Sequence, residues 1–385
     1  MIPMQLFLAL CALAAPQDPA LEKALATAAK YAETGRFEAA VATLKGAGAD
    51  TSEDARARTQ YGVWMMRWTE ARLAAGDPEL AGLAAVDAWY EVADVFSAAT
   101  QLKGASDEPW EQWSECLLNA NDLGQALSVA DDGLKAQRDS VRLLLQRGRV
   151  LMAQARKAAQ VGKAEDEAAR YAEAESSFKL AMGKGPKLAA PCLRLAELKV
   201  TLWAQRGATD AGLRAEAVQL WSEAVRREPK GVDLPTLHAW LGADAVAPLT
   251  AYLEKEPESV DAVWFRGLAH WAANPIGWEG LRADMQRVLE VNPGFVDANF
   301  YLGDGAMRRA QELVSGGEWE TADAHFAVAS RFWAAFLRAR ALWKPVRNRA
   351  HPLRAGTRSR NAPPPNPYEC ALVVRQLVND KRARL

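Results

Sequence analysis

Isoleucine, cysteine and histidine are scarce: the 385-residue sequence contains two, four and four of them, respectively. So little isoleucine disfavours β-sheet, which relies on β-branched side chains for its packing. The cysteines lie far apart without C-x-x-C spacing, so the sequence predicts neither a zinc site nor a disulfide framework. We expect structural roles for the dispersed histidines, which are His238, His270, His325 and His351.

The sequence also lacks the motifs of common active sites. It contains no G-x-S-x-G, H-E-x-x-H, G-x-x-x-x-G-K-S/T or G-x-G-x-x-G, which would indicate a nucleophile, a zinc-binding pair or a phosphate-binding loop. Carboxylates are abundant, but their spacing singles out no acid–base pair. We therefore expect a protein that is not an enzyme and that binds neither a cofactor nor a metal ion.

Alanine, in contrast, is abundant and accounts for 77 of the 385 residues. It is the best helix former, and its small side chain lets neighbouring helices approach closely. Hydrophobic residues at 50% and charged residues at 25% are the proportions of a globular protein rather than of a disordered chain. This composition predicts an all-α fold.

The N-terminal segment has the features of a short secretory signal peptide. An uncharged apolar run covers residues 6–15, and Ala12 and Ala14 form an A-x-A cleavage site before Pro16. The run is too short to cross a bilayer core of about 30 Å, and no other stretch is apolar enough to span a membrane. We expect cleavage of residues 1–14 and export to the periplasm or the medium. Because no lysine or arginine precedes the run, the alternative is a buried first helix in an uncleaved, cytoplasmic protein.

The net charge of −1 conceals two oppositely charged regions. Residues 331–385 contain 13 lysines and arginines but only Glu369 and Asp380, whereas the rest of the chain contains 34 basic and 46 acidic residues. Residues 345–368 are also rich in proline, which predicts a Pro/Arg-rich linker, followed by a basic tail over 369–385 that includes one short helical stretch. This region either binds an anionic ligand or lies across the acidic body. Its candidate residues are Arg347, Arg349, Arg354, Arg358 and Arg360.

A repeated pattern organises the middle of the chain. P-x-x-V-D occurs three times, starting at Pro229, Pro257 and Pro293. Upstream, small residues flank a large one with the spacing A-x3-W-x2-A-x4-P. Positions i, i+4 and i+7 share one helix face, so the small residues admit a neighbouring helix and the large residue fills the gap. The spacing occurs at Ala174/Phe178/Ala181/Pro186, Ala217/Trp221/Ala224/Pro229, Ala245/Leu249/Tyr252/Pro257 and, with larger residues, Leu281/Met285/Val288/Pro293.

Each proline of this pattern ends one helix and starts the next. A complete unit lies at residues 28–47, where a helix, a turn at Thr34-Gly35-Arg36 and a second helix are predicted. The unit resembles the tetratricopeptide repeat (TPR), which has W-x2-L-G-x2-Y in its first helix, A-x3-F in its second and a proline behind it. The best matches are 28–47, 110–138 and 260–293. The repeats are degenerate, with a mean spacing of about 40 rather than 34 residues.

The resemblance, which is to exported bacterial proteins of this type, implies an α-solenoid of about eight repeats over residues 15–344, wound as a right-handed superhelix. In TPR proteins the first helices line a concave groove that binds peptides. We also expect Trp264, Trp271 and Trp278, spaced by seven, to share one face of a long first helix. The alternative for the aromatic residues is core packing. The groove candidates that the resemblance implies are Trp264, Trp271, Phe300, Asp304 and Arg308.

These observations predict a non-enzymatic scaffold or adaptor whose partner is a protein or a peptide. Nucleic acid is not the expected partner. One alternative is a helical-repeat module that binds carbohydrate through exposed tryptophans or assists an enzyme system. The other is a protein that binds an anionic polymer or a membrane surface through its basic tail.

Overall fold

The computed structural model describes residues 18–342, and every regular element in that range is helical. The predicted all-α class is therefore confirmed. The predicted signal peptide (1–14), linker (345–368) and basic tail (369–385) lie outside the described residues, as do Arg347, Arg349, Arg354, Arg358 and Arg360. The chain divides into two compact units, Met1–Pro186 and Lys187–Leu385.

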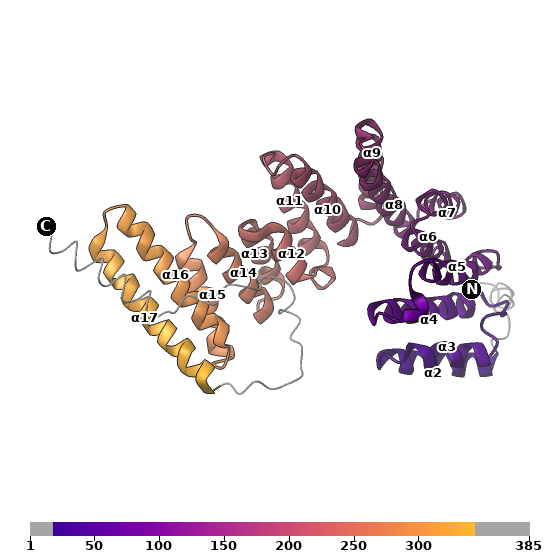
Figure 1. Ribbon diagram of the computed structural model, residues 1–385, viewed down its shortest axis with the longest axis horizontal. Helices are drawn as coiled ribbons and strands as arrows, with labels where there is room; N and C mark the ends of the chain where they lie inside the picture. Colours follow the sequence, from indigo (N-terminus) through magenta and orange to yellow (C-terminus); the bar gives the residue numbers. More distant parts are fainter. Residues whose placement is uncertain (1–17, 343–385) are drawn as a thin grey trace, which may run out of the picture. The chain divides into compact units, whose positions relative to one another are not determined.

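The described residues of the first unit form four successive helix pairs (Figure 1). At Gly35, between the first two helices, φ is +73°, a conformation that glycine adopts without steric cost, so the predicted turn is confirmed. A 3-10 turn at Pro78–Leu80 precedes α5. The pairs are α2 (Pro19–Glu33) with α3 (Phe37–Gly46), α4 (Ala55–Ala74) with α5 (Leu83–Thr100), α6 (Glu108–Asn119) with α7 (Leu123–Ala136), and α8 (Val141–Gln160) with α9 (Ala164–Lys184).

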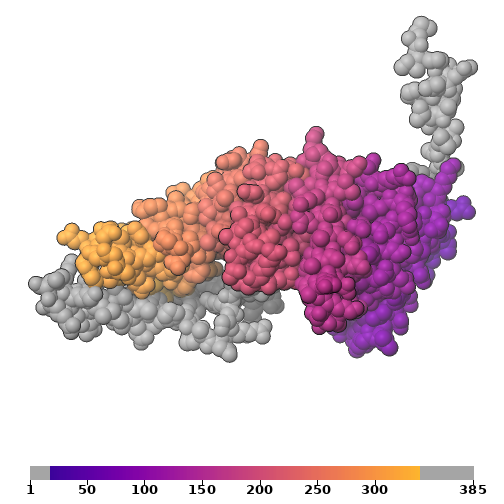
Figure 2. All heavy atoms as spheres, turned by 90° about the horizontal axis from the view of Figure 1, so that it is seen from above, coloured from indigo at the N-terminus to yellow at the C-terminus, as the bar shows by residue number. Residues whose placement is uncertain are grey.

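The described residues of the second unit form four further pairs, and successive helices from α14 to α17 contact one another. The last of these helices are orange and yellow in Figure 2. Pro229, Pro257 and Pro293 each follow the end of a second helix, as predicted. The pairs are α10 (Ala190–Gln205) with α11 (Ala211–Arg227), α12 (Leu234–Leu241) with α13 (Val246–Lys255), α14 (Val260–Ala272) with α15 (Trp278–Val291), and α16 (Val296–Ser315) with α17 (Trp319–Leu342). Short 3-10 turns at Pro229–Gly231 and Gly242–Ala245 flank α12.

The predicted small–large–small rows lie in the core. Ala174, Phe178 and Ala181 are completely buried on α9. The corresponding residues of α11 and α15 are also buried, and the remaining row has a buried Ala245 and Leu249 but a half-buried Tyr252. The spacing of small and large residues therefore does identify the packing face of the second helices.

Within a pair, a glycine of the first helix receives a large side chain from the second helix. A Cβ added to Gly62 on α4 would lie 2.8 Å from Phe96 Cε1 on α5, which is closer than van der Waals contact allows. The same arrangement recurs with other large side chains, so the two helices approach more closely than any residue with a Cβ permits. We call these contacts the glycine locks; they are Gly62–Phe96, Gly148–Phe178, Gly267–Met285 and Gly303–Trp333.

The prediction that Trp264, Trp271 and Trp278 share one long helix is wrong. Helix α14 ends at Ala272, and Trp278 is the first residue of α15. The intervening Asn274–Pro275 segment cannot continue a helix, because proline lacks the backbone N–H and its ring clashes with the preceding turn.

Candidate functional site

The predicted groove residues lie on α14 and α16, the first helices of the last two pairs. Trp264 is only 6% exposed. Its ring packs edge to face on Phe295 and Tyr301, with centroid distances of 4.7 and 5.5 Å. Trp264 is therefore a core residue, and its prediction as a groove residue is corrected.

Trp271, Asp304 and Arg308 are brought together, but their polar atoms bind one another. The indole Nε1 of Trp271 donates to Asp304 Oδ2 at 2.7 Å. The Arg308 guanidinium lies 5.4 Å from the centre of the Trp271 ring and donates to the backbone oxygens of Trp271 and Ala273. Arg308 thus supplies donors to carbonyls at the end of α14, which no backbone N–H of that helix reaches.

Tyr301, which we did not predict as a site residue, is at the centre of an aromatic cluster. Its ring meets the rings of Trp271 and Phe300 at 80° and 83°, with centroid distances of 5.2 and 5.4 Å. Phe300 in turn packs on Phe336 of α17 at 5.5 Å. Trp271, Phe300, Tyr301 and Phe336 are all half-buried, and we call these four residues the aromatic row. The only sequence signal for Tyr301 was its place beside Phe300.

Two exposed carboxylates occupy the first turns of the same two helices. Asp261 lies in the first turn of α14 and Asp297 in the first turn of α16. Asp297 precedes Phe300 by three residues, so at helical spacing its carboxylate shares a helix face with the aromatic row. Asp261 precedes the buried Trp264 by three residues and acts on Tyr252 of α13, so it belongs to another surface.

A second cluster, on α6 and α8 of the first unit, is made of charged side chains. Arg142 Nη1 donates to Glu111 Oε2 at 3.0 Å, and Arg149 Nη2 donates to Glu115 Oε1 at 2.8 Å. Burial raises the pKa of Glu111, against the opposing effect of Arg142. Because these arginines of α8 bind carboxylates of α6, the cluster joins the α6–α7 helix pair to the α8–α9 helix pair.

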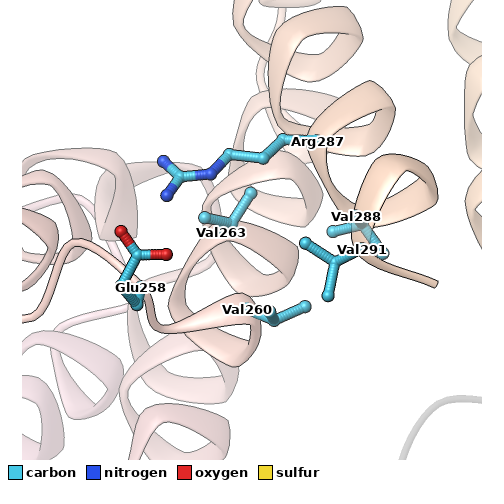
Figure 3. A pocket seen from close by; sticks show the side chains of 6 residues that line it. All are labelled: Glu258, Val260, Val263, Arg287, Val288 and Val291. Carbon is cyan, nitrogen blue, oxygen red and sulfur yellow. The ribbon is translucent and has the colours of Figure 1, made fainter.

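A small pocket opens between α14 and α15 (Figure 3). Its floor is apolar, and Arg287, whose guanidinium donates to the carbonyl of Pro257, borders it together with Glu258. Glu258 and Arg287 are both exposed to solvent, so neither has the buried environment that tunes a catalytic acid or base. The apolar lining consists of Val260, Val263, Val288 and Val291.

The titratable side chains in the described part of the chain show no activated nucleophile. Burial raises the pKa of the free Cys116 and Cys192 thiols, which keeps both in the unreactive protonated form. Burial also lowers the pKa of His238, His270 and His325. Among residues 18–342 no group of three potential metal ligands is close enough to hold an ion, and none of the helices there is long and apolar enough to span a membrane.

The repeating unit itself shows what kind of protein this is. In two pairs a glycine of the first helix is faced by a large residue of the second helix that follows an alanine by four positions. These are Gly148 with Ala174 and Phe178, and Gly303 with Ala329 and Trp333. Glycine in the first helix and A-x3-F in the second are the TPR pattern. The chain is built of TPR-like helix pairs.

The chain is similar to several solved structures at low sequence identity. No family model and no curated protein matches the sequence. Among solved structures, yeast Tom70 aligns with 86% of this chain and 65% of its own, at 13% identity and a TM-score of 0.41. YrrB, described as a TPR protein with an unusual peptide-binding site, aligns with 54% of this chain and 96% of its own, at 18% identity and a TM-score of 0.31. Human IFIT1, as a dimer with m7Gppp-AAAA, aligns with 78% of this chain and 68% of its own, at 15% identity and a TM-score of 0.37.

Proposed function

We propose that this TPR-like protein is a non-enzymatic scaffold that binds a protein or peptide through the aromatic row of its last two helix pairs. The observation that carries the proposal is the row itself: Trp271, Tyr301, Phe300 and Phe336 contact one another in that order, come from three helices and are only half-buried. Aromatic side chains that remain partly exposed at the surface provide large contact areas at little conformational cost, and they dominate binding energies at interfaces.

One exposed carboxylate beside the row favours a cationic partner. Asp297 is exposed three residues before Phe300, whereas the carboxylate of Asp304 is engaged by Trp271. Exposed charges of one sign steer an oppositely charged partner and fix its orientation more than they add affinity. A peptide with apolar or proline residues next to lysine or arginine fits this arrangement.

The structure gives less support to a carbohydrate-binding module. Sugar stacking needs an open indole face, but Trp264 is buried in the core and the Arg308 guanidinium lies over one face of the half-buried Trp271 ring. A ligand for the basic tail remains a prediction, because the tail lies outside the described residues.

We further propose that the protein is exported, on the strength of the apolar run and the A-x-A site at its N-terminus. The N-terminal residue of the mature protein tests this proposal. Cleavage before Ala15 supports export, and a mature protein that retains Met1 or Ile2 contradicts it.

Peptide selection against the full chain tests the binding function. Peptides selected from a random displayed library are titrated into the wild type, Phe300→Ala and the control Leu83→Ala, which alters an 81% exposed side chain on α5. We expect Phe300→Ala to weaken binding at least tenfold and Leu83→Ala to leave it unchanged, with circular dichroism confirming that both variants are folded. If the two variants bind the selected peptides equally well, the aromatic row is not the binding surface.

A further inference from the structure

The chain contains a segment whose chemistry matches the aromatic row. Residues 361–368 read Asn-Ala-Pro-Pro-Pro-Asn-Pro-Tyr, with Arg354, Arg358 and Arg360 shortly before them. Consecutive prolines favour the extended polyproline II conformation, and proline-rich segments of this kind bind to surfaces lined by aromatic rings. We propose that residues 354–368 are the ligand of the aromatic row in their own chain. This inference rests on the proposed function, because it names the class of ligand that the row binds.

The ring geometry of the row suits proline. The Tyr301 ring stands nearly perpendicular to the rings of Trp271 and Phe300, so the row does not form one flat surface. A pyrrolidine ring is compact and rigid, and its C–H groups can pack against an aromatic face in such a row. Because a proline-rich segment is already extended when free, it loses little conformational entropy on binding.

The charges of the two partners are complementary. Arg354, Arg358 and Arg360 precede the prolines without an intervening acidic residue, and Asp297 is exposed in the first turn of α16, three residues before Phe300. Opposite charges at the border of an apolar contact orient the segment along it and are screened by salt.

The length of the chain allows the contact. Residues 343–362 lie between Leu342, the last residue of α17, and Pro363. Extended, a segment of that length reaches about 65 Å, whereas α17, with 24 residues, is only about 36 Å long. A tethered segment within reach has an effective concentration in the millimolar range, so even weak intrinsic affinity gives high occupancy.

The consequence is a binding surface that carries its own competitor. An external protein with a proline-rich, basic segment gains access to the aromatic row only by displacing residues 354–368. The affinity of the full chain for such a peptide is therefore lower than that of a chain whose own prolines have been replaced.

Site-specific photo-crosslinking in the full chain tests the contact. Phe336 is replaced by p-benzoylphenylalanine, and in a control the same residue replaces Val291, which is 62% exposed on α15. After irradiation we expect crosslinks from position 336 to residues 361–368 of the same chain, and none above background from position 291. Crosslinks that join two chains, or that reach other residues only, overturn the proposal.

Limited proteolysis provides a measurement that leaves the row unlabelled. Trypsin cleavage after Arg358 and Arg360 is followed by mass spectrometry in the wild type, Phe300→Ala and Leu83→Ala. We expect Phe300→Ala to raise the cleavage rate at least fivefold and Leu83→Ala to leave it unchanged. Equal rates in all three proteins overturn the proposal.

A proline-substituted chain separates this proposal from the binding function. In one variant Pro363, Pro364, Pro365 and Pro367 are changed to alanine, and in the matched control Pro345 and Pro352 are changed instead. We expect the first variant to lose the crosslink and to bind a synthetic 354–368 peptide at least fivefold more tightly than the control does. If selected peptides bind through Phe300 but the synthetic peptide does not, the inference fails and the scaffold function stands; if no peptide binds, both fail.

Discussion

The indole nitrogen of Trp271 donates a hydrogen bond to Asp304 at 2.7 Å and so joins the first helices of two successive pairs. Arg308, one turn further along α16, lies against the same indole ring and binds the last carbonyls of α14. The resemblance to TPR proteins implied that all three side chains line a groove. The structure shows instead that they hold one pair against the next, with only part of the Trp271 ring left at the surface.

Removing either partner of this hydrogen bond is expected to destabilise the protein. We expect Asp304→Ala and Trp271→Phe each to lower the free energy of unfolding by about 1 kcal/mol. The double variant should lose less free energy of unfolding than the two single variants together, by at least about 0.5 kcal/mol. Urea denaturation followed by circular dichroism measures all three. Asp261→Ala, an exposed carboxylate on the neighbouring helix, is the control and should change stability by less than about 0.5 kcal/mol. If the losses of the two single variants add up to the loss of the double variant, the hydrogen bond between Trp271 and Asp304 contributes nothing to stability.

Two Gly→Ala substitutions, one at a glycine lock and one at an exposed glycine, are expected to have opposite effects on stability. At Gly148 the new methyl group meets the ring of Phe178, which is completely buried, so overpacking should cost about 1–3 kcal/mol. At Gly183, on the exposed side of α9, nothing lies within 4 Å of the added Cβ, and the better helix propensity of alanine should stabilise by about 0.5–1 kcal/mol. Thermal denaturation of the two variants distinguishes these effects, and a neutral Gly148→Ala variant would contradict the close approach of α8 and α9.

The ion pair between Arg266 and Asp284 is expected to matter most when only one partner is removed. Asp284 is 3% exposed, and the guanidinium binds both of its carboxylate oxygens, at 2.7 and 2.9 Å. Arg266→Met leaves a buried carboxylate without a partner and should destabilise by about 3–5 kcal/mol. The double variant Arg266→Met/Asp284→Leu should recover much of that loss. If the double variant is as unstable as the single one, the lost packing rather than the unpaired charge is responsible.

Stability should fall as the pH decreases through the range of the histidines. Burial lowers the pKa of His238 below its unfolded value of about 6.5, so the unfolded chain binds a proton that the folded chain excludes. The free energy of unfolding therefore decreases below pH 6.5, by at most about 1.4 kcal/mol per pH unit for each such histidine. His270 and His325, whose pKa values are also lowered, add to the slope. Urea denaturation at pH 7.5 and 5.5 should show a smaller difference for His238→Phe than for the wild type; identical differences would exclude His238 as a contributor.

The helix pairs were predictable from the sequence because their packing depends on residue size at fixed spacing. Ala174, Phe178 and Ala181 carry that information locally, and the proline behind them ends the helix whatever its surroundings. The aromatic row was less predictable. Whether Trp264 is buried depends on Phe295 and Tyr301, which come from the next pair, and no spacing within α14 reports such contacts. The break before Trp278 is visible in the sequence as Asn274–Pro275, because a proline there ends the helix whatever the spacing of the tryptophans.

The glycine locks also determine how the chain tolerates rearrangement. Each lock lies within one helix pair, so a pair that is duplicated, deleted or moved takes both the glycine and its large partner along and remains a matched set. The last two pairs are in addition joined to each other, because Trp271 and Asp304 belong to different pairs, as do Leu281 and Gly305, whose side chain and backbone are in close contact. Residues 260–342 should therefore behave as one transplantable module. The α8–α9 pair, with Gly148 and Phe178, can be exchanged only if its buried contacts with the preceding pair are kept, such as the hydrogen bond from Gln146 to Ser114.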